Sequence, residues 1–93
     1  MIITKHAYKN LKKRTGLNKK AFDKLIRGAE KNGIRHKDTV GKLNGYFTKL
    51  YKKHLNATDT LIYNNFVFVC RKNVLITVFP VPHYIQVILK ERK

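Results

Sequence analysis

The side chains in this sequence that are suited to chemistry are basic and hydroxyl groups rather than acids. The chain contains no serine, and its five carboxylates are scattered, at Asp23, Glu30, Asp38, Asp59 and Glu91. A two-metal nuclease needs clustered carboxylates to hold its cations, so this spacing argues against a metal site. There is no glycine-rich phosphate loop and no GxSxG elbow. What remains is acid–base chemistry by His, Lys, Arg and Tyr, with no cofactor expected.

RNA cleavage is one reaction that such side chains catalyse without a metal. It needs a base for the 2′-hydroxyl proton, cations for the phosphorane and an acid for the leaving oxygen. Among the four histidines, His6 is the strongest candidate base, because the start of a helix favours a neutral imidazole. Lys5, Lys9 and Lys13 lie close to it in sequence. A solvated histidine on a charged helix is the alternative interpretation, and both stay open.

The charge of the chain is its most unusual property. Lys and Arg number 21 against 5 Asp and Glu, a formal net charge of +16, and residues 1–56 hold 16 of the basic side chains. Such an excess repels itself and attracts polyanions, which predicts a nucleic-acid partner, RNA before DNA. Alternatively, the excess positive charge keeps the protein soluble or reflects the codon bias of an AT-rich genome. The side chains predicted to contact nucleic acid are Lys5, Lys9, Lys12, Lys13, Lys19, Lys20, Lys24, Arg35, His36 and Lys37.

Five tyrosines add a second kind of contact, because an aromatic ring beside basic side chains stacks on bases. Tyr8 and Tyr46 are the freer candidates for this role. Tyr51 and Tyr63 are predicted to lie in the core.

The elements that must position these residues begin with two helices. Thr4 as N-cap and Gly16 as C-terminal stop predict a first helix through about residue 15. Asn18 and Gly33 bound a second helix in the same way. The apolar stripe of the second helix is formed by Ala21, Phe22, Leu25, Ile26 and Ala29.

A third helical pattern runs over about residues 40–54, where apolar residues recur at spacings of three and four. Asp38 or Thr39 is its expected N-cap. Gly41 and Gly45 weaken the start of this segment, so an irregular beginning is expected.

The period then changes to that of strands. Runs of β-forming residues predict strands over 60–63, 66–71 and 74–79, with a tight turn at Asn64-Asn65 between the first two. Residues 84–89 are expected to add a short edge strand. The order predicts one α+β domain over 1–93, with two to three helices in about 4–55. These helices are expected to pack on one face of an antiparallel sheet of three to four strands in about 60–89.

The cellular location of the protein is predicted from the targeting and membrane-spanning segments that the sequence lacks. No signal peptide and no apolar run of about 20 residues is visible, so no membrane partner is expected. The one cysteine, Cys70, lies in an apolar run and is read as a small buried side chain. A cytoplasmic location is therefore predicted, which is the host cytoplasm if the chain is encoded by a phage.

The opening residues 2–14, Ile-Ile-Thr-Lys-His-Ala through Arg14, resemble the start of small RelE- and barnase-like nuclease relatives. The segment 74–79 resembles their late strand. The chain also looks like small proteins of phages and prophages of low-GC Gram-positive bacteria. The resemblance implies a toxin-type RNase fold, a metal-independent endoribonuclease, and catalytic roles for His6, Arg14 and Thr77.

Two function classes without catalysis remain beside this one. A phage-encoded inhibitor would bind an acidic surface of a host protein or defence complex through the same charge. A packaging accessory of a virion would use the charge on a nucleic acid. The sequence determines neither the base specificity nor the oligomeric state.

Overall fold

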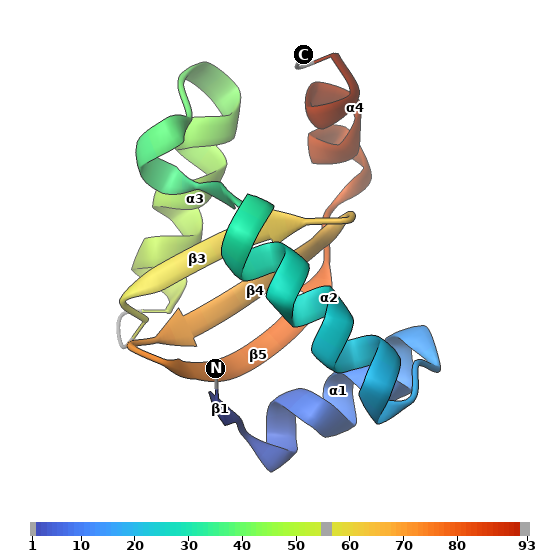
Figure 1. Cartoon of the computed structure of the whole chain (residues 1–93). Coiled ribbons are helices and arrows are strands. Elements are labelled where there is room, and N and C mark those ends of the chain that lie inside the picture. The colour runs from blue at the N-terminus through green and yellow to red at the C-terminus, as the bar shows by residue number, and fades with distance from the viewer. Residues whose placement is uncertain (1, 55–56, 92–93) are drawn as a thin grey trace.

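The computed structural model describes residues 2–54 and 57–91 and contains helices, strands and one turn of 3-10 helix (Figure 1). In chain order the elements are β1 (Ile2–Ile3), α1 (Lys5–Thr15), α2 (Lys19–Asn32), β2 (Ile34–Arg35), η1 (the 3-10 helix His36–Asp38), α3 (Gly41–Lys53), β3 (Asp59–Tyr63), β4 (Phe66–Arg71), β5 (Val74–Pro80) and α4 (His83–Glu91). The predicted α+β class is confirmed, and the leading helices precede the strands of the meander.

Helices α1 and α2 begin at the predicted capping residues. The Thr4 hydroxyl oxygen accepts a hydrogen bond from the Ala7 amide at 3.1 Å, and the Asn18 side chain accepts one from the Ala21 amide at 2.9 Å. Gly16 ends α1 with a φ of +69°, a conformation that glycine adopts without steric cost. Local signals therefore determine both ends of α1 and the start of α2.

Helix α3 is confirmed, and so is its irregular start, but its predicted cap is wrong. Its N-cap is Val40, which has no side-chain capping bond, and Gly41, the first residue of the helix, has a φ of +65°. The Thr39 hydroxyl instead donates to the His36 carbonyl at 2.7 Å. The Asn44 amide reaches back to the Thr39 carbonyl at 3.1 Å, so a side chain from within the helix stabilises its entry.

The strands form one sheet of order β1-β5-β4-β3-β2. The predicted meander β3-β4-β5 is antiparallel throughout, and Asn64 and Asn65 turn with φ of 52° and 65° as a two-residue hairpin requires. Two strands of two residues each were not predicted: β2 pairs antiparallel with β3, and β1 pairs parallel with β5. Such short segments have no alternating pattern of their own, so only the pairing reveals them.

The predicted edge strand over 84–89 is wrong, because this segment is helix α4. The amides of Ile85 and Gln86 both donate to the Pro82 carbonyl at 3.0 Å, which starts the helix. Val81, Ile85 and Ile88 are spaced by four and three, and they pack toward one apolar cluster. Among the helices that the structure describes, none is long and apolar enough to cross a membrane.

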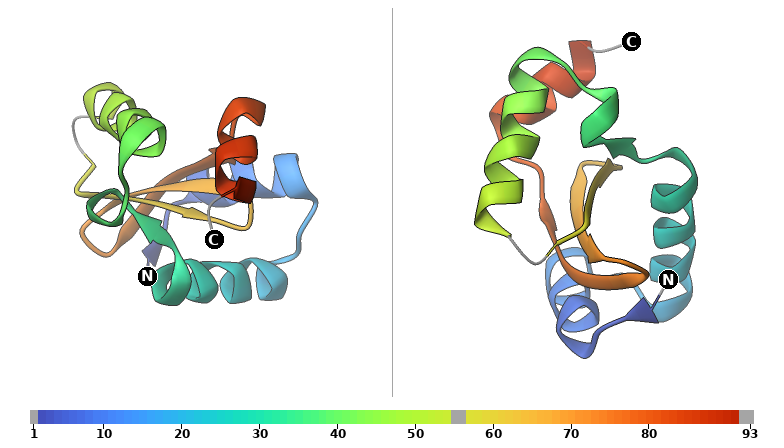
Figure 2. Two further views of the ribbon diagram at one scale, coloured as in Figure 1. Left: turned by 90° about the horizontal axis from the view of Figure 1, so that it is seen from above. Right: turned by 90° about the vertical axis from the view of Figure 1, so that its left-hand side faces the viewer.

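Helices cover both faces of the sheet, not one face as predicted (Figure 2). Alternate residues of each strand point to opposite faces, and each set belongs to a separate apolar cluster. The cluster under α1 and α2 contains Ala7, Leu11, Phe22, Ile26, Ala29, Leu61, Phe68, Cys70, Leu75 and Val78. The cluster under α3 and α4 contains Leu43, Tyr46, Phe47, Leu50, Ala57, Ile62, Val67, Val69, Val81 and Ile85.

Gly28 lets α2 approach the sheet closely. A Cβ at this position would lie 2.6 Å from the Tyr63 hydroxyl oxygen and 2.7 Å from the ring carbon that bears it. Tyr63 belongs to β3 and packs against the cluster under α1 and α2. The contact explains why a glycine, which weakens a helix interior, stands in the middle of α2.

Replacing Gly28 by Ala is therefore expected to lower the free energy of unfolding by about 1–2 kcal/mol, because the rigid Tyr63 ring must move. Gly45→Ala is the matched control, since Gly45 lies within α3 and a Cβ there would meet nothing within 4 Å. The free energy of unfolding of that variant should rise by about 0.5–1 kcal/mol. Urea denaturation measures the free energy of unfolding of both variants. In a protein that also carries Tyr63→Leu, Gly28→Ala should no longer lower the free energy of unfolding. Equal gains in the two alanine variants would contradict the close contact.

Candidate nucleic-acid interface

Helices α1 and α2 lie on the same face of the sheet (Figure 2). Their basic side chains are exposed to solvent. Residues 5–32 contain ten Lys and Arg and only two carboxylates. All ten basic side chains are exposed, and the nine other than Arg14, whose guanidinium is bonded to the sheet, are what we call the α1–α2 face: Lys5, Lys9, Lys12, Lys13, Lys19, Lys20, Lys24, Arg27 and Lys31. Two carboxylates are too few to neutralise these nine cations, so most of their charge is available to a ligand.

Four members of this face form one row along α2. Lys20, Lys24, Arg27 and Lys31 follow one another at spacings of four, three and four residues. At 1.5 Å per residue the row is about 16 Å long. The predicted nucleic-acid contacts include Lys20 and Lys24 but omit Arg27 and Lys31, although the helical spacing places all four on one side of α2.

Tyr8 lies within the α1–α2 face. Its ring stacks on that of Phe22 with centroids 5.8 Å apart and planes 27° apart, and Phe22 is fully buried. Tyr8 also lines two surface hollows. The first, of about 260 Å³, is bordered by Ile3, Thr4, Lys5 and Lys19, and the second, of about 410 Å³, is bordered by Lys9, Lys12 and Lys13. A partly buried aromatic ring is thus surrounded by amines.

Tyr63 packs against the core as predicted, but Tyr46 and Tyr51 differ from the sequence prediction. Tyr46 is only 8% exposed and lies in the cluster under α3 and α4, where burial and then the charge of Tyr84 raise its pKa to about 12. Tyr51, expected in the core, is 58% exposed. The buried stripe of α3 is formed by Leu43, Tyr46, Phe47 and Leu50, and Tyr51 lies at its margin near the end of the helix. The buried ring of Tyr46 is therefore inaccessible to a base, and the prediction that it stacks on one is wrong.

His6 and Arg14 lie along the edge of α1 that points away from Tyr8. His6, Asn10 and Arg14 are spaced by four residues, and a residue two positions from Tyr8 points in nearly the opposite direction. His6 is exposed, and its Nε2 lies 3.0 Å from Nδ2 of Asn10. Because an amide nitrogen only donates, Nε2 is the acceptor in this contact, so Asn10 orients the ring and occupies the lone pair that a base role of His6 would use.

Arg14 has a structural contact of its own. Its Nη1 donates a hydrogen bond of 2.7 Å to the Val78 carbonyl on β5. At the other end of α1, the Thr4 hydroxyl donates to the Leu75 carbonyl at 3.1 Å. Together with the short strand β1, which pairs with Val74 and Leu75, these contacts occupy carbonyls of β5, so less of this sheet edge can pair with another chain. Arg14 therefore positions α1, whether or not it contacts a ligand.

Thr77 does not join His6 and Arg14. It is paired across the sheet with Val69, and directly paired residues point to the same face. Val69 belongs to the cluster under α3 and α4, so the Thr77 side chain lies on the face opposite α1. The structure does not bring the three residues implied by the family resemblance into one site.

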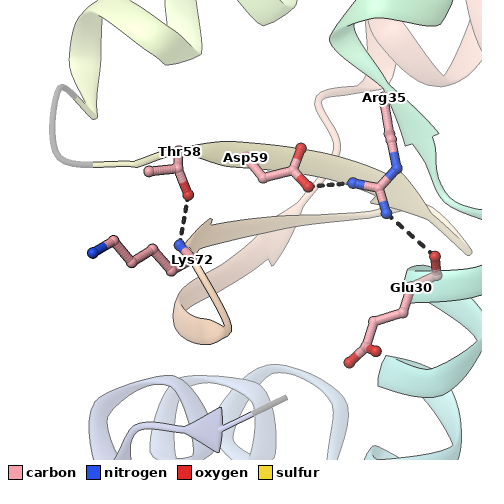
Figure 3. A network of polar contacts seen from close by, with 5 residues as sticks. All are labelled: Glu30, Arg35, Thr58, Asp59 and Lys72. Atoms are coloured by element: carbon pink, nitrogen blue, oxygen red, sulfur yellow. Dashed lines mark hydrogen bonds and ion pairs between the residues drawn. The ribbon is translucent and has the colours of Figure 1, made fainter.

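Arg35 lies at the opposite edge of the sheet, on β2, and is engaged within the fold (Figure 3). Its guanidinium pairs with the Asp59 carboxylate and donates to the Glu30 carbonyl at 3.3 Å. Because Asp59 neutralises the guanidinium, Arg35 has less to offer a phosphate than the lysines of α1 and α2. Lys37, two residues further on, is exposed.

His36 is held by α3. Its ring stacks on Phe47 with centroids 5.6 Å apart, and its Nε2 lies 3.3 Å from the Thr48 hydroxyl oxygen. The single hydroxyl proton of Thr48 is donated to the Asn44 carbonyl at 3.0 Å, so the ring nitrogen is the donor to Thr48. His36 thus has a packing role in the structure, and a phosphate contact by this residue stays a prediction.

Cys70 is not a nucleophile of this site. It is 1% exposed, as the sequence predicted. Burial, and then the charge of Asp59, raises the pKa of its thiol to about 12. The thiol is therefore protonated at neutral pH, and the thiolate is the reactive form of cysteine.

Comparison of the chain with protein-family models, with curated proteins and with solved structures found no match. The RelE- and barnase-like resemblance therefore stays a prediction from the sequence.

The contact between Arg14 and Val78 makes a prediction about stability. Arg14→Ala is expected to lower the free energy of unfolding by about 1 kcal/mol, because a hydrogen bond from a charged donor is lost. Lys13→Ala, at the exposed neighbouring position, removes the same charge and should change the free energy by less than about 0.5 kcal/mol. Equal stability of the two variants in urea denaturation would show that Arg14 does not hold α1 on β5.

Proposed function

We propose that this chain binds nucleic acid through the α1–α2 face, with RNA as the first candidate. The observation that supports the proposal is the row of exposed basic side chains on α2, together with the lysines of α1. A field of this strength attracts a polyanion and raises the rate of encounter. Lysine contacts to phosphate oxygens give affinity without base specificity, so the proposed binding is general in sequence.

Salt and charge reversal test this proposal. Lys20→Glu combined with Lys24→Glu is expected to weaken binding of a labelled oligonucleotide by about 10- to 100-fold at low salt, because each lysine displaces counterions from the ligand. For a single strand, the logarithm of the association constant should fall against the logarithm of salt concentration with a slope of about −3 to −6. Fluorescence anisotropy measures both.

The matched control lies on α3, which carries a smaller basic group on the opposite side of the sheet. Lys49 and Lys53 are exposed and separated by four residues, as are Lys20 and Lys24. Changing both to Glu alters the net charge equally and should weaken binding by less than about threefold. The proposal fails if the two double variants weaken binding equally, or if wild type binds neither RNA nor DNA at about 50 mM salt. A protein complex from host lysate that survives nuclease treatment would instead favour the inhibitor class.

A ribonuclease activity centred on His6 is a second candidate function. The exposed imidazole, held by Asn10 at 3.0 Å, lies on the same helix as the lysines of the α1–α2 face. An RNA backbone bound by Lys9 and Lys13, three and seven residues further along α1, would be close to this imidazole. Its Nε2 would accept the 2′-hydroxyl proton once the Asn10 amide releases it. Thr77 is not part of this candidate, because its side chain lies on the other face of the sheet.

Under this second candidate, His6→Ala is expected to lower the rate of RNA cleavage by about 10²- to 10⁴-fold while RNA binding stays unchanged. His83→Ala is the control, because His83 is exposed at the start of α4, whose helix packs on the opposite face of the sheet. Gel assays on single-turnover reactions measure the rate. If highly purified wild type does not cleave RNA, or if the His83 variant loses as much activity, the catalytic role of His6 is wrong and binding alone remains.

A further inference from the structure

We propose that Tyr8 is a stacking platform for an unpaired base, and that the ligand of the α1–α2 face is therefore single-stranded nucleic acid. This inference rests on the proposed function and deepens it by naming the form of the nucleic acid. It depends on how the Tyr8 ring is supported, on what surrounds it, and on what the neighbouring side chains are free to do.

The Tyr8 ring is supported from below. Phe22 stacks on it at 5.8 Å and is itself fully buried between α2 and the sheet. Ala7, the preceding residue on α1, is also fully buried, which fixes the backbone that carries the ring. A platform already held in place loses little conformational entropy when a base stacks on it, which favours binding.

The surroundings of Tyr8 suit a base attached to a phosphate chain. The first hollow combines the apolar side chain of Ile3 with the amines of Lys5 and Lys19. The second continues past Tyr8 between lysines of α1. Tyr8 is common to both hollows, so a strand following them would pass over the ring with amines on either side. Aromatic rings within a basic groove are how proteins bind single strands without sequence preference.

In the part of the chain that the structure describes, the surface around Tyr8 lacks the combination of free side chains that proteins use to contact base edges in a double-stranded groove. Helices that read the major groove combine Arg or Lys with Asn or Gln on base edges. Among the described residues, the basic ones that border the two hollows are all lysines, which lack the planar fork of arginine, and no Asn or Gln borders them. The amide of Asn10 is engaged with His6 on the other edge of α1. The Thr4 hydroxyl is used between the Ala7 amide and the Leu75 carbonyl. A partly buried ring in a hollow is accessible to a base that leaves the stack, not to one within a duplex.

The experiment compares a labelled single strand with the same strand annealed to its complement, each as RNA and as DNA, at low salt. Tyr8→Leu is expected to weaken single-strand binding about tenfold and to leave duplex binding within about twofold. Tyr8→Phe keeps the ring and should bind as wild type does. Tyr51→Leu removes an accessible tyrosine from α3 on the opposite face and should change neither affinity. The RNA and DNA arms show which backbone the face prefers.

A second measurement on the wild-type chain does not depend on how a variant folds. A single strand carrying 5-iodouracil forms a zero-length photocrosslink to an aromatic ring stacked on it. The crosslink is expected at Tyr8, in the tryptic peptide formed by residues 6–9. A crosslink mapping only to Tyr51 or Tyr84, the exposed tyrosines of α3 and α4, would overturn the proposal.

The results distinguish a failure of the stacking role of Tyr8 from a failure of nucleic-acid binding by the α1–α2 face. If Lys20→Glu with Lys24→Glu weakens binding while Tyr8→Leu does not, the face binds nucleic acid and the stacking role is wrong. The stacking role is also wrong if Tyr8→Leu weakens single-strand and duplex binding equally. If wild type binds neither form, the proposed function and this inference both fail.

Discussion

The central strand β4 is buried on both of its faces, and the rest of the structure follows from that constraint. Val67, Phe68, Val69 and Cys70 are consecutive and each is at most 1% exposed. In a strand, consecutive side chains point to opposite faces, so neither face of this sheet can be left to water. One helical layer is not enough, and the chain supplies α1 and α2 on one side and α3 and α4 on the other.

This arrangement decides where the positive charge goes. The apolar sides of α1 and α2 are used against the sheet, so their lysines have only the outward sides of these helices to occupy. A helix as short and cationic as α1 is marginal in isolation, and packing must hold it. Ala7 and Leu11 are buried completely, and Thr4 and Arg14 donate hydrogen bonds to β5 from the two ends of the helix. The core thus stabilises a surface whose charges repel one another.

The same contacts give the residues of α1 distinct tasks. Arg14 and Thr4 attach the helix to the sheet, Asn10 holds His6, and Tyr8 rests on Phe22 between the lysines. Arg14, which sequence resemblance would place in a catalytic set, has a sufficient structural reason to be present. The exposed lysines have no comparable attachment to the sheet within the described fold, so they and Tyr8 are the side chains of these two helices best placed for a ligand.

The sequence by itself determined what depends on near neighbours: the caps of α1 and α2, the Asn-Asn turn, the meander and the charge of the leading helices. These features are encoded in the φ preferences, capping side chains and apolar periods of a few adjacent residues. Only the tertiary structure decided that residues 83–91 form a helix, that β1 joins β5, that Tyr46 is buried and Tyr51 exposed, and that Thr77 faces away from His6. Each of these depends on which distant surface a segment meets, because burial and pairing between residues far apart in sequence outweigh weak local preference.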